Sequence, residues 1–281
     1  MQKKTVIIAG CGYIGSTLAQ QLLDMGHAVT GLRRNINQLP QGIQGVKADL
    51  SQLDDLKTAL ATISRCDILV YCASANAQTA ESYQAAYIDG LNNLLAALPV
   101  TPQHTFFTSS TSVYHQNDHS WVDEESPCQP DTFSGKITQQ AENRLLSSHL
   151  PATVVRFSGI YGPGRNHLIN RVKQGAVAPQ HPLQYSNRIH RDDCAGVLAH
   201  LIQRVCNNEA IDDCYLASDD QPCSLYEITH WLAQQMNVTE LTESISRFAS
   251  SKRCNNSRLK ATGYNFIHPG FKSGYAAMLS S

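Results

Sequence analysis

Apolar runs typical of strands alternate with helical patterns through the first 157 residues of the chain. Six short runs rich in apolar and β-branched residues predict strands at 6–9, 28–32, 45–48, 67–72, 104–108 and 152–157. Apolar residues at helical spacing predict helices after residue 12 and at about 53–63, 81–97 and 137–148. Strands separated by such helices form a parallel, doubly wound sheet, so we expect an α/β protein with a Rossmann-type fold. Its ligand crevice would lie at the carboxyl ends of the strands.

The pattern is less regular in about the last 120 residues, where prolines interrupt it at 163, 179, 182, 222 and 269. We expect two domains. A Rossmann domain would occupy residues 1–158, and a smaller substrate-side domain, partly interleaved with the first, would occupy residues 159–281.

The most informative motif follows the first predicted strand, where Gly10-Cys11-Gly12-Tyr13-Ile14-Gly15 opens a helix. Glycines at this spacing let the backbone turn tightly, approach a pyrophosphate without a Cβ in the way and pack the helix against the strand. The helix N-terminus supplies N–H groups and partial positive charge for the phosphates. We therefore expect a dinucleotide cofactor here. Further cofactor contacts are expected where later strands end, at Asp49, Leu50, Ala73, Ser74, Thr108 and Ser109.

The end of the second predicted strand favours NADP, although NAD stays open. An NAD enzyme usually places Asp or Glu at this point to hold the ribose hydroxyls, whereas this chain has Arg33-Arg34. A guanidinium neutralises a 2′-phosphate and can hold it through two parallel hydrogen bonds. The alternative is a pair of solvated arginines on a surface loop.

Composition fits an ordinary enzyme-sized protein. The 281 residues are 42% hydrophobic and 16% charged, with a formal net charge of -1. This balance predicts no nucleic-acid or membrane partner, and no segment approaches the roughly 20 apolar residues of a membrane span. The N-terminal apolar stretch is interpreted as a core strand and not as a signal peptide, because it runs straight into the glycine loop. We expect a cytoplasmic protein with a small-molecule substrate, and a homodimer is left open.

The cysteines and histidines predict no metal site. The nine cysteines include no C-x-x-C pair, and most are interpreted as small buried residues in a reducing compartment. His115 and His119 are four residues apart but lie in a polar stretch without a third ligand.

Several segments resemble the motifs of a known family, in the order in which that family carries them. They are 87–95, 107–114, 125–130, 156–165, 189–195 and 255–264. Together they resemble the extended short-chain dehydrogenases/reductases of the NAD(P)-dependent epimerase/dehydratase type, over nearly the whole chain. The resemblance implies NAD(P) binding. It also implies that Ser110, four residues before Tyr114, orients the substrate.

The chain departs from that family at the acid/base pair. The family uses Tyr-x-x-x-Lys, in which the ammonium lowers the pKa of the phenol. Counting from Pro130 puts Ser134 at the Tyr position and Thr138 at the Lys position, and Asp89 stands where the family carries Asn. This pattern resembles an atypical subgroup with a degenerate motif. Substitutes for the missing acid could be Tyr161, Tyr114, His115, Asp89 or His190.

Two functions follow from this pattern. In the first, the protein is an NADP-linked oxidoreductase or epimerase that acts on a small hydroxy or nucleotide-sugar substrate with an unconventional acid. In the second, it binds NADP(H) without turnover and acts as a sensor or regulatory protein. The retention of Ser110 and of the segment 161–164 favours the first.

Overall fold

The computed structural model describes residues 3–244 and 251–280. The chain divides into two compact units. Unit 1 contains residues 1–113, 128–156 and 195–215, and unit 2 contains residues 114–127, 157–194 and 216–281. The boundary expected after residue 158 lies close to the change of unit between Arg156 and Phe157, and the chain also changes unit at four other points.

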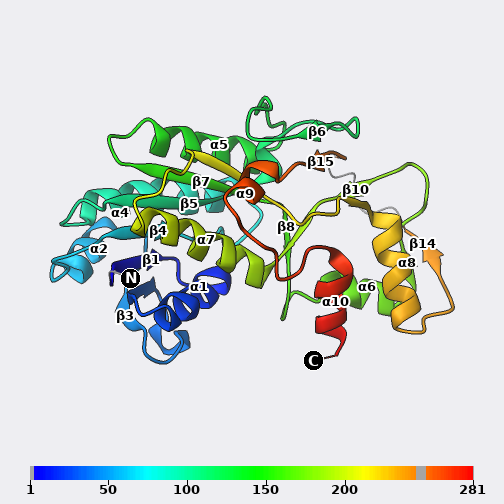
Figure 1. Ribbon diagram of the computed structural model, residues 1–281, viewed down its shortest axis with the longest axis horizontal. Coiled ribbons are helices and arrows are strands. Elements are labelled where there is room, and N and C mark those ends of the chain that lie inside the picture. The colour runs from blue at the N-terminus through cyan, green and yellow to red at the C-terminus, as the bar shows by residue number, and fades with distance from the viewer. Residues whose placement is uncertain (1–2, 245–250, 281) are drawn as a thin grey trace. The chain divides into compact units, whose positions relative to one another are not determined.

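Unit 1 is built on a seven-stranded parallel sheet (Figure 1). The strand order is β12 (Cys214–Ala217), β7 (Ala152–Phe157), β5 (His104–Ser110), β4 (Ile68–Tyr71), β1 (Thr5–Ala9), β2 (Ala28–Arg33) and β3 (Gln44–Lys47). The central strands β1, β4 and β7 are buried almost throughout, which explains why their sequences are continuous apolar runs. The predicted α/β, Rossmann-type fold is confirmed. Strand β12 was not predicted.

Helices cover both faces of this sheet. Ile7 and Ala9 of β1 belong to a buried apolar cluster that includes residues of α2, α4 and α5. Ile8 points the opposite way, because side chains alternate along a strand, and it faces α1: a Cβ on Gly15 would lie 3.1 Å from its Cγ2. These helices are α1 (Tyr13–Asp24), α2 (Leu53–Leu60), α4 (Gly90–Ala97) and α5 (Phe133–Leu146), and α7 (Arg191–Cys206) is drawn in front of the sheet in Figure 1.

The helix predicted over about 81–97 is present but changes its winding. Helix α3 (Ala80–Tyr83) continues into a π-helical turn at Gln84–Asp89 and then into α4. The Tyr71 hydroxyl donates to the Ala86 carbonyl at 2.5 Å, and a Cβ on Gly90 would also lie 2.5 Å from that hydroxyl. Tyr71 therefore fills the space at the widened turn. Such turns are frequent at functional sites.

The predicted start of α5 was wrong, since the helix begins at Phe133 and not at 137. The Thr132 hydroxyl accepts a hydrogen bond from the Gly135 amide at 3.1 Å and so caps the helix. The apolar pattern begins only at Ile137. Gly135, a poor helix former, also obscured the first turn.

Unit 2 contains short strands in pairs and a small helical core. The pairs are β6 (Trp121–Val122) with β15 (Arg253–Cys254), β8 (Gly159–Tyr161) with β11 (Arg188–His190), β9 (Ala176–Val177) with β14 (Thr242–Glu243), and β10 (Tyr185–Ser186) with β13 (Cys223–Ser224). Its other helices are α6 (His167–Lys173), α8 (Leu225–Gln235), α9 (Ser257–Ala261) and α10 (Phe271–Leu279). Residues of α6, α8 and α10 form its apolar core. Two 3-10 turns, Ile36–Gln38 and Thr111–Val113, complete the elements.

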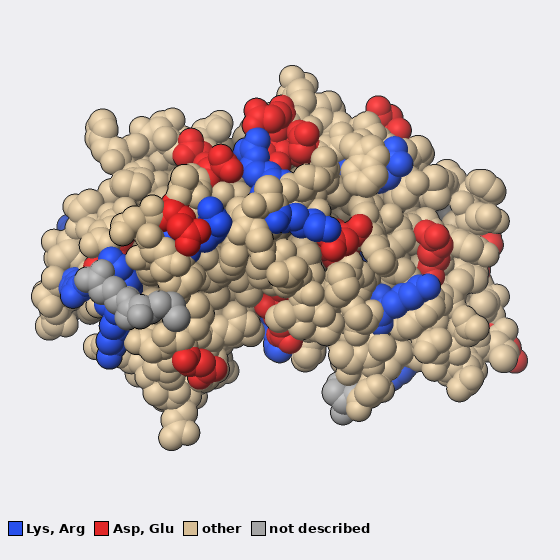
Figure 2. Space-filling view, viewed as in Figure 1, with Lys and Arg blue, Asp and Glu red and all other residues tan. Residues whose placement is uncertain are grey.

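The surface carries charges of both signs. On the face drawn in Figure 2, acidic and basic side chains are interspersed among many uncharged ones. Among the described residues, no helix combines the length and the apolar character that a membrane crossing requires.

Candidate functional site

The glycine loop lies at the carboxyl end of β1, wedged between the ends of two neighbouring strands. The amides of Gly10 and Cys11 donate to the Leu32 carbonyl of β2 at 3.1 and 3.0 Å. Gly10 has a φ of +79°, and a Cβ there would lie 2.5 Å from the Cα of Ala73, which follows β4. No other residue fits this position, so the first glycine of the motif is required by the fold itself.

Gly12 has a different environment. It is the N-cap of α1, and a Cβ there would meet only the Gly10 carbonyl, at 3.8 Å. No side chain caps this helix, and its first turn holds no acidic residue. An open glycine at an uncapped helix N-terminus offers N–H groups and partial positive charge to an anion. This is the arrangement that a pyrophosphate requires.

Arg33, the last residue of β2, and Arg34, which follows it, lie at the same edge of the sheet as this loop, since the carboxyl ends of parallel strands meet there. The Arg33 guanidinium donates to the Gln38 carbonyl at 3.2 Å and to its side-chain oxygen at 2.5 Å, and Arg34 donates to the Asn76 side chain at 2.9 Å. All these partners are uncharged. Within residues 3–244 and 251–280, neither arginine forms an ion pair with a carboxylate, although the charge of Arg34 acts on Asp49 from a greater distance.

Asp49 and Leu50 follow the end of β3. The Asp49 carboxylate accepts hydrogen bonds from the amide and the hydroxyl of Ser51 at 2.9 and 2.8 Å. These bonds, with a smaller contribution from the Arg34 charge, lower the pKa of Asp49 against the effect of its burial. The Leu50 carbonyl accepts from the Asn93 amide at 3.0 Å, which joins this strand end to α4.

The end of β5 is joined to α5 through a buried charge. Glu142 and Arg156 form an ion pair, with 2.8 Å between Oε2 and Nη2, and the Ser109 hydroxyl donates to the other oxygen of Glu142. The Thr108 hydroxyl donates to the Tyr71 carbonyl of β4 at 3.1 Å. These contacts fix α5 relative to β4, β5 and β7. Ser109 and Thr108, expected at the cofactor, have their hydroxyls engaged within the protein.

Three of the predicted catalytic residues, Ser110, Ser134 and Thr138, lie on β5 and α5 of unit 1. Ser110 is the last residue of β5 and accepts a hydrogen bond from the Ser112 amide at 3.1 Å. Ser134 is half-buried in the first turn of α5, and Thr138, one turn later, is 1% exposed. A Cβ on Gly135 would lie 2.4 Å from the Ser112 carbonyl, so the start of α5 touches the turn that follows Ser110. Their catalytic roles stay predictions.

The other candidate acids have varied surroundings. Asp89, the last residue of the π-helical turn, is exposed and accepts from the Gln84 amide at 3.1 Å. In unit 2, burial against α10 raises the pKa of Tyr161, whose ring stacks on Tyr275 with 4.6 Å between centroids. The Tyr114 hydroxyl donates to the Asp123 carbonyl at 2.7 Å. A phenol with a raised pKa gives up its proton less readily, which weakens the case for Tyr161 as the acid.

Two functional contacts were not foreseen from the sequence. Asn76 holds Arg34 but lies 42 residues away, and no motif marks it. The second is the contact of Glu142 with Ser109 of β5 and Arg156 of β7, which depends on the order of the strands in the sheet.

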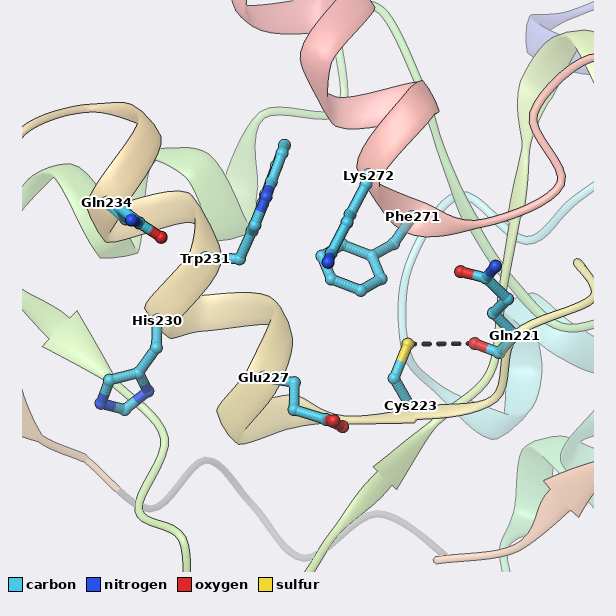
Figure 3. Close-up of a pocket in the computed structure, with 8 residues that line it drawn as sticks. All are labelled: Gln221, Cys223, Glu227, His230, Trp231, Gln234, Phe271 and Lys272. Atoms are coloured by element: carbon cyan, nitrogen blue, oxygen red, sulfur yellow. Dashed lines mark hydrogen bonds between the residues drawn. The ribbon is translucent and has the colours of Figure 1, made fainter.

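A pocket of about 400 Å³ lies in unit 2 between α8 and α10 (Figure 3). Trp231 and Phe271 form aromatic walls, with Lys272 beside them. Glu227 also lines it, but its carboxylate accepts from the amide and hydroxyl of Ser224 and so caps α8. None of the predicted site residues lines this pocket, and we do not assign the candidate site to it.

Comparison with known proteins shows a family match. The NAD dependent epimerase/dehydratase family matches residues 6–211, which include the whole glycine loop and α5. Protein YeeZ of Escherichia coli (strain K12) is 29% identical over 211 residues, which cover 71% of this chain and 73% of YeeZ.

Two solved structures share the fold. A Methylobacillus flagellatus structure assigned to the NAD-dependent epimerases/dehydratases is 38% identical and superposes with a TM-score of 0.84, covering 99% of this chain and 98% of that one. UDP-glucose 4-epimerase of Thermus thermophilus, solved with NAD, has a TM-score of 0.79 at 18% identity and covers 96% of each chain. The chain described here therefore belongs to the NAD dependent epimerase/dehydratase family.

Proposed function

We propose that this chain is an NADP(H)-binding oxidoreductase or epimerase that acts on a small hydroxy compound or a nucleotide sugar. The proposal rests above all on the open Gly12 position at the uncapped N-terminus of α1, since a pyrophosphate is the group that this position fits.

The preference for NADP(H) rests on Arg33 and Arg34. They stand where a carboxylate would hold the ribose of NAD, and their partners Gln38 and Asn76 are neutral. A 2′-phosphate would bring negative charge into direct contact with these guanidinium groups, whose hydrogen-bond partners among the described residues are neutral. It would also accept two parallel hydrogen bonds from one guanidinium.

In the catalytic part of the proposal, Ser110 orients the substrate oxygen beside the nicotinamide. The contact between the Gly135 backbone and the Ser112 carbonyl brings α5 to this strand end, where a phenol at position 134 would complete the usual acid. With Ser134 and Thr138 in those places, another group or a water molecule must transfer the proton. A nucleotide sugar is the preferred substrate class, because the similar fold of UDP-glucose 4-epimerase serves one.

The second candidate function is NADP(H) binding without turnover. What favours it is the sequence of α5, which has neither a phenol nor an ammonium at positions 134 and 138, the two positions that we predict to correspond to the family's Tyr and Lys. A positioned general acid raises the rate of such reactions about 10²-fold or more, so a site without one can bind the cofactor and yet show no turnover.

Turnover assays distinguish the two functions. The chain is incubated with NADPH and a panel of carbonyl compounds, followed by NADPH absorbance, and with NADP⁺ and UDP-sugars, followed by proton NMR. Activity that disappears in Gly12→Val and falls at least tenfold in Ser110→Ala supports the enzyme. NADPH binding with no reaction in either assay supports the sensor, and activity that persists in Gly12→Val contradicts both.

A further inference from the structure

His190, at the end of β11 in unit 2, is a buried imidazole with bonding capacity left. It is 2% exposed, and its Nε2 has no hydrogen-bond partner in the part of the chain that the structure describes. Its Nδ1 accepts one bond of 3.2 Å from the Asp192 amide, at the long end of the usual range. A metal ion bound at Nδ1, the nitrogen that faces Asp192, would replace this long hydrogen bond.

Two further metal-ligating side chains meet this ring. The imidazole of His268 lies with its centroid 4.1 Å from that of His190, and a carboxylate oxygen of Asp192 lies 3.6 Å from the Nδ1 of His190. One donor atom from each of the three residues lies within 4.8 Å of the other two.

Neighbouring residues hold this arrangement in place. The buried Asp193 carboxylate accepts from the amides of Ile267 and His268 at 2.7 and 2.9 Å and from the Tyr264 hydroxyl at 2.9 Å. These bonds fix the segment that carries His268 against the start of α7. Arg191 binds one oxygen of Asp192 at 2.9 Å and leaves the other facing His190. Such outer contacts orient ligands in metal sites.

The geometry points to a divalent metal site formed by His190, Asp192 and His268, with zinc as the best match. Two imidazoles and one carboxylate form a typical zinc ligand set that leaves a fourth position for water or a substrate oxygen. Donors that lie 2.0 to 2.1 Å from a tetrahedral zinc ion are about 3.3 Å apart, so shifts of about an ångström or less would close the site. The charge of Arg191 opposes that of the ion, which predicts weaker binding than in a four-ligand structural site.

The site is tested with untagged full-length protein that has been freed of metal with a chelator. Titration with Zn²⁺ alone, followed by calorimetry, is expected to show one ion per chain, and Co²⁺ in its place should give the absorption bands of a tetrahedral nitrogen and oxygen site. Asp192→Asn and His268→Ala should each weaken Zn²⁺ binding at least tenfold. Circular dichroism and the melting temperature of the metal-free variants check that they fold.

His230→Ala is the matched control. His230 is a half-buried histidine of α8 whose Nδ1 lies 3.0 Å from the Tyr226 carbonyl, and its loss should leave Zn²⁺ affinity unchanged. Because an ion that binds only the native state raises its stability, Zn²⁺ should also raise the melting temperature of the wild type more than that of His268→Ala. Equal Zn²⁺ affinity in the wild type and in His268→Ala would overturn the proposal, as would no binding at all.

Discussion

At the scale of single residues, Gly12 is the position where a side chain should interfere with function and not with folding. Its surroundings leave room for a larger residue, since the nearest atom to a Cβ is 3.8 Å away. We predict that Gly12→Val weakens NADPH binding by at least about tenfold, because the branched side chain occupies the place of the pyrophosphate. Calorimetry measures the affinity, and circular dichroism with thermal unfolding serves as the control. A folded variant that binds NADPH as the wild type does would show that the cofactor lies elsewhere.

Arg34 is the residue that should distinguish the two cofactors. Hydrogen bonds to a charged group contribute about 1.5 to 3 kcal/mol, so Arg34→Ala should weaken NADPH binding roughly ten- to a hundredfold and leave NADH binding nearly unchanged. Arg144→Ala, which removes an exposed arginine from the last turn of α5, is the matched control. If NADPH affinity falls equally in both variants, the effect is one of net charge and Arg34 does not bind the phosphate.

At the scale of elements, α5 depends on the buried pair of Glu142 and Arg156. Removing one partner leaves an uncompensated buried charge, so Glu142→Gln should lower the free energy of unfolding by about 3 to 5 kcal/mol. The control is Glu209→Gln. This substitution removes the 42% exposed carboxylate of Glu209 from its 3.0 Å ion pair with Arg204, and it should lower the free energy of unfolding by no more than about 1 kcal/mol. Urea unfolding measures both. Similar losses in the two variants would mean that the buried pair does not hold α5.

The same helix allows a test of whether Ser134 and Thr138 replace the family's acid/base pair. If positions 134 and 138 correspond to the family's Tyr and Lys, Ser134→Tyr with Thr138→Lys should raise reduction of a generic carbonyl by NADPH about 10²-fold. Ser134→Tyr alone should gain less, because its phenol would lack the cation that lowers its pKa. Because Thr138 is buried, a lysine at this position needs more space than the threonine occupies. NADPH affinity is therefore measured as well, to check that the double variant still binds the cofactor. A folded double variant that binds NADPH and gains nothing would argue against this registration.

At the scale of the whole molecule, local sequence patterns predicted most strands and helices of the Rossmann-type fold. They did not predict features that depend on contacts between residues distant in the sequence. Buried strands such as β4 and β7 were predictable because both faces of a parallel sheet demand apolar residues. Strand β12 was missed because its four residues, Cys214–Ala217, lie in an irregular part of the chain and gain their pairing only from β7. The π-helical turn was also missed, since it depends on the Tyr71 hydroxyl of another element.

The same holds for the candidate site, where local features were predicted from the sequence and contacts between distant segments were not. The glycine loop was predictable because its constraint is local: a positive φ at Gly10 and a helix that starts at Tyr13. The bond between Arg34 and Asn76, and the meeting of His190 with His268, require distant segments to come together. The spacing of residues along the sequence does not predict such contacts.

We propose that the glycine loop and the two arginines bind NADP(H). The most direct test is a pair of calorimetric titrations of the wild-type chain, one with NADPH and one with NADH, at the same ionic strength. We predict one site for each cofactor and a dissociation constant at least about tenfold lower for NADPH, from the charge-assisted bonds to its 2′-phosphate. Equal constants, or tighter binding of NADH, would contradict the account.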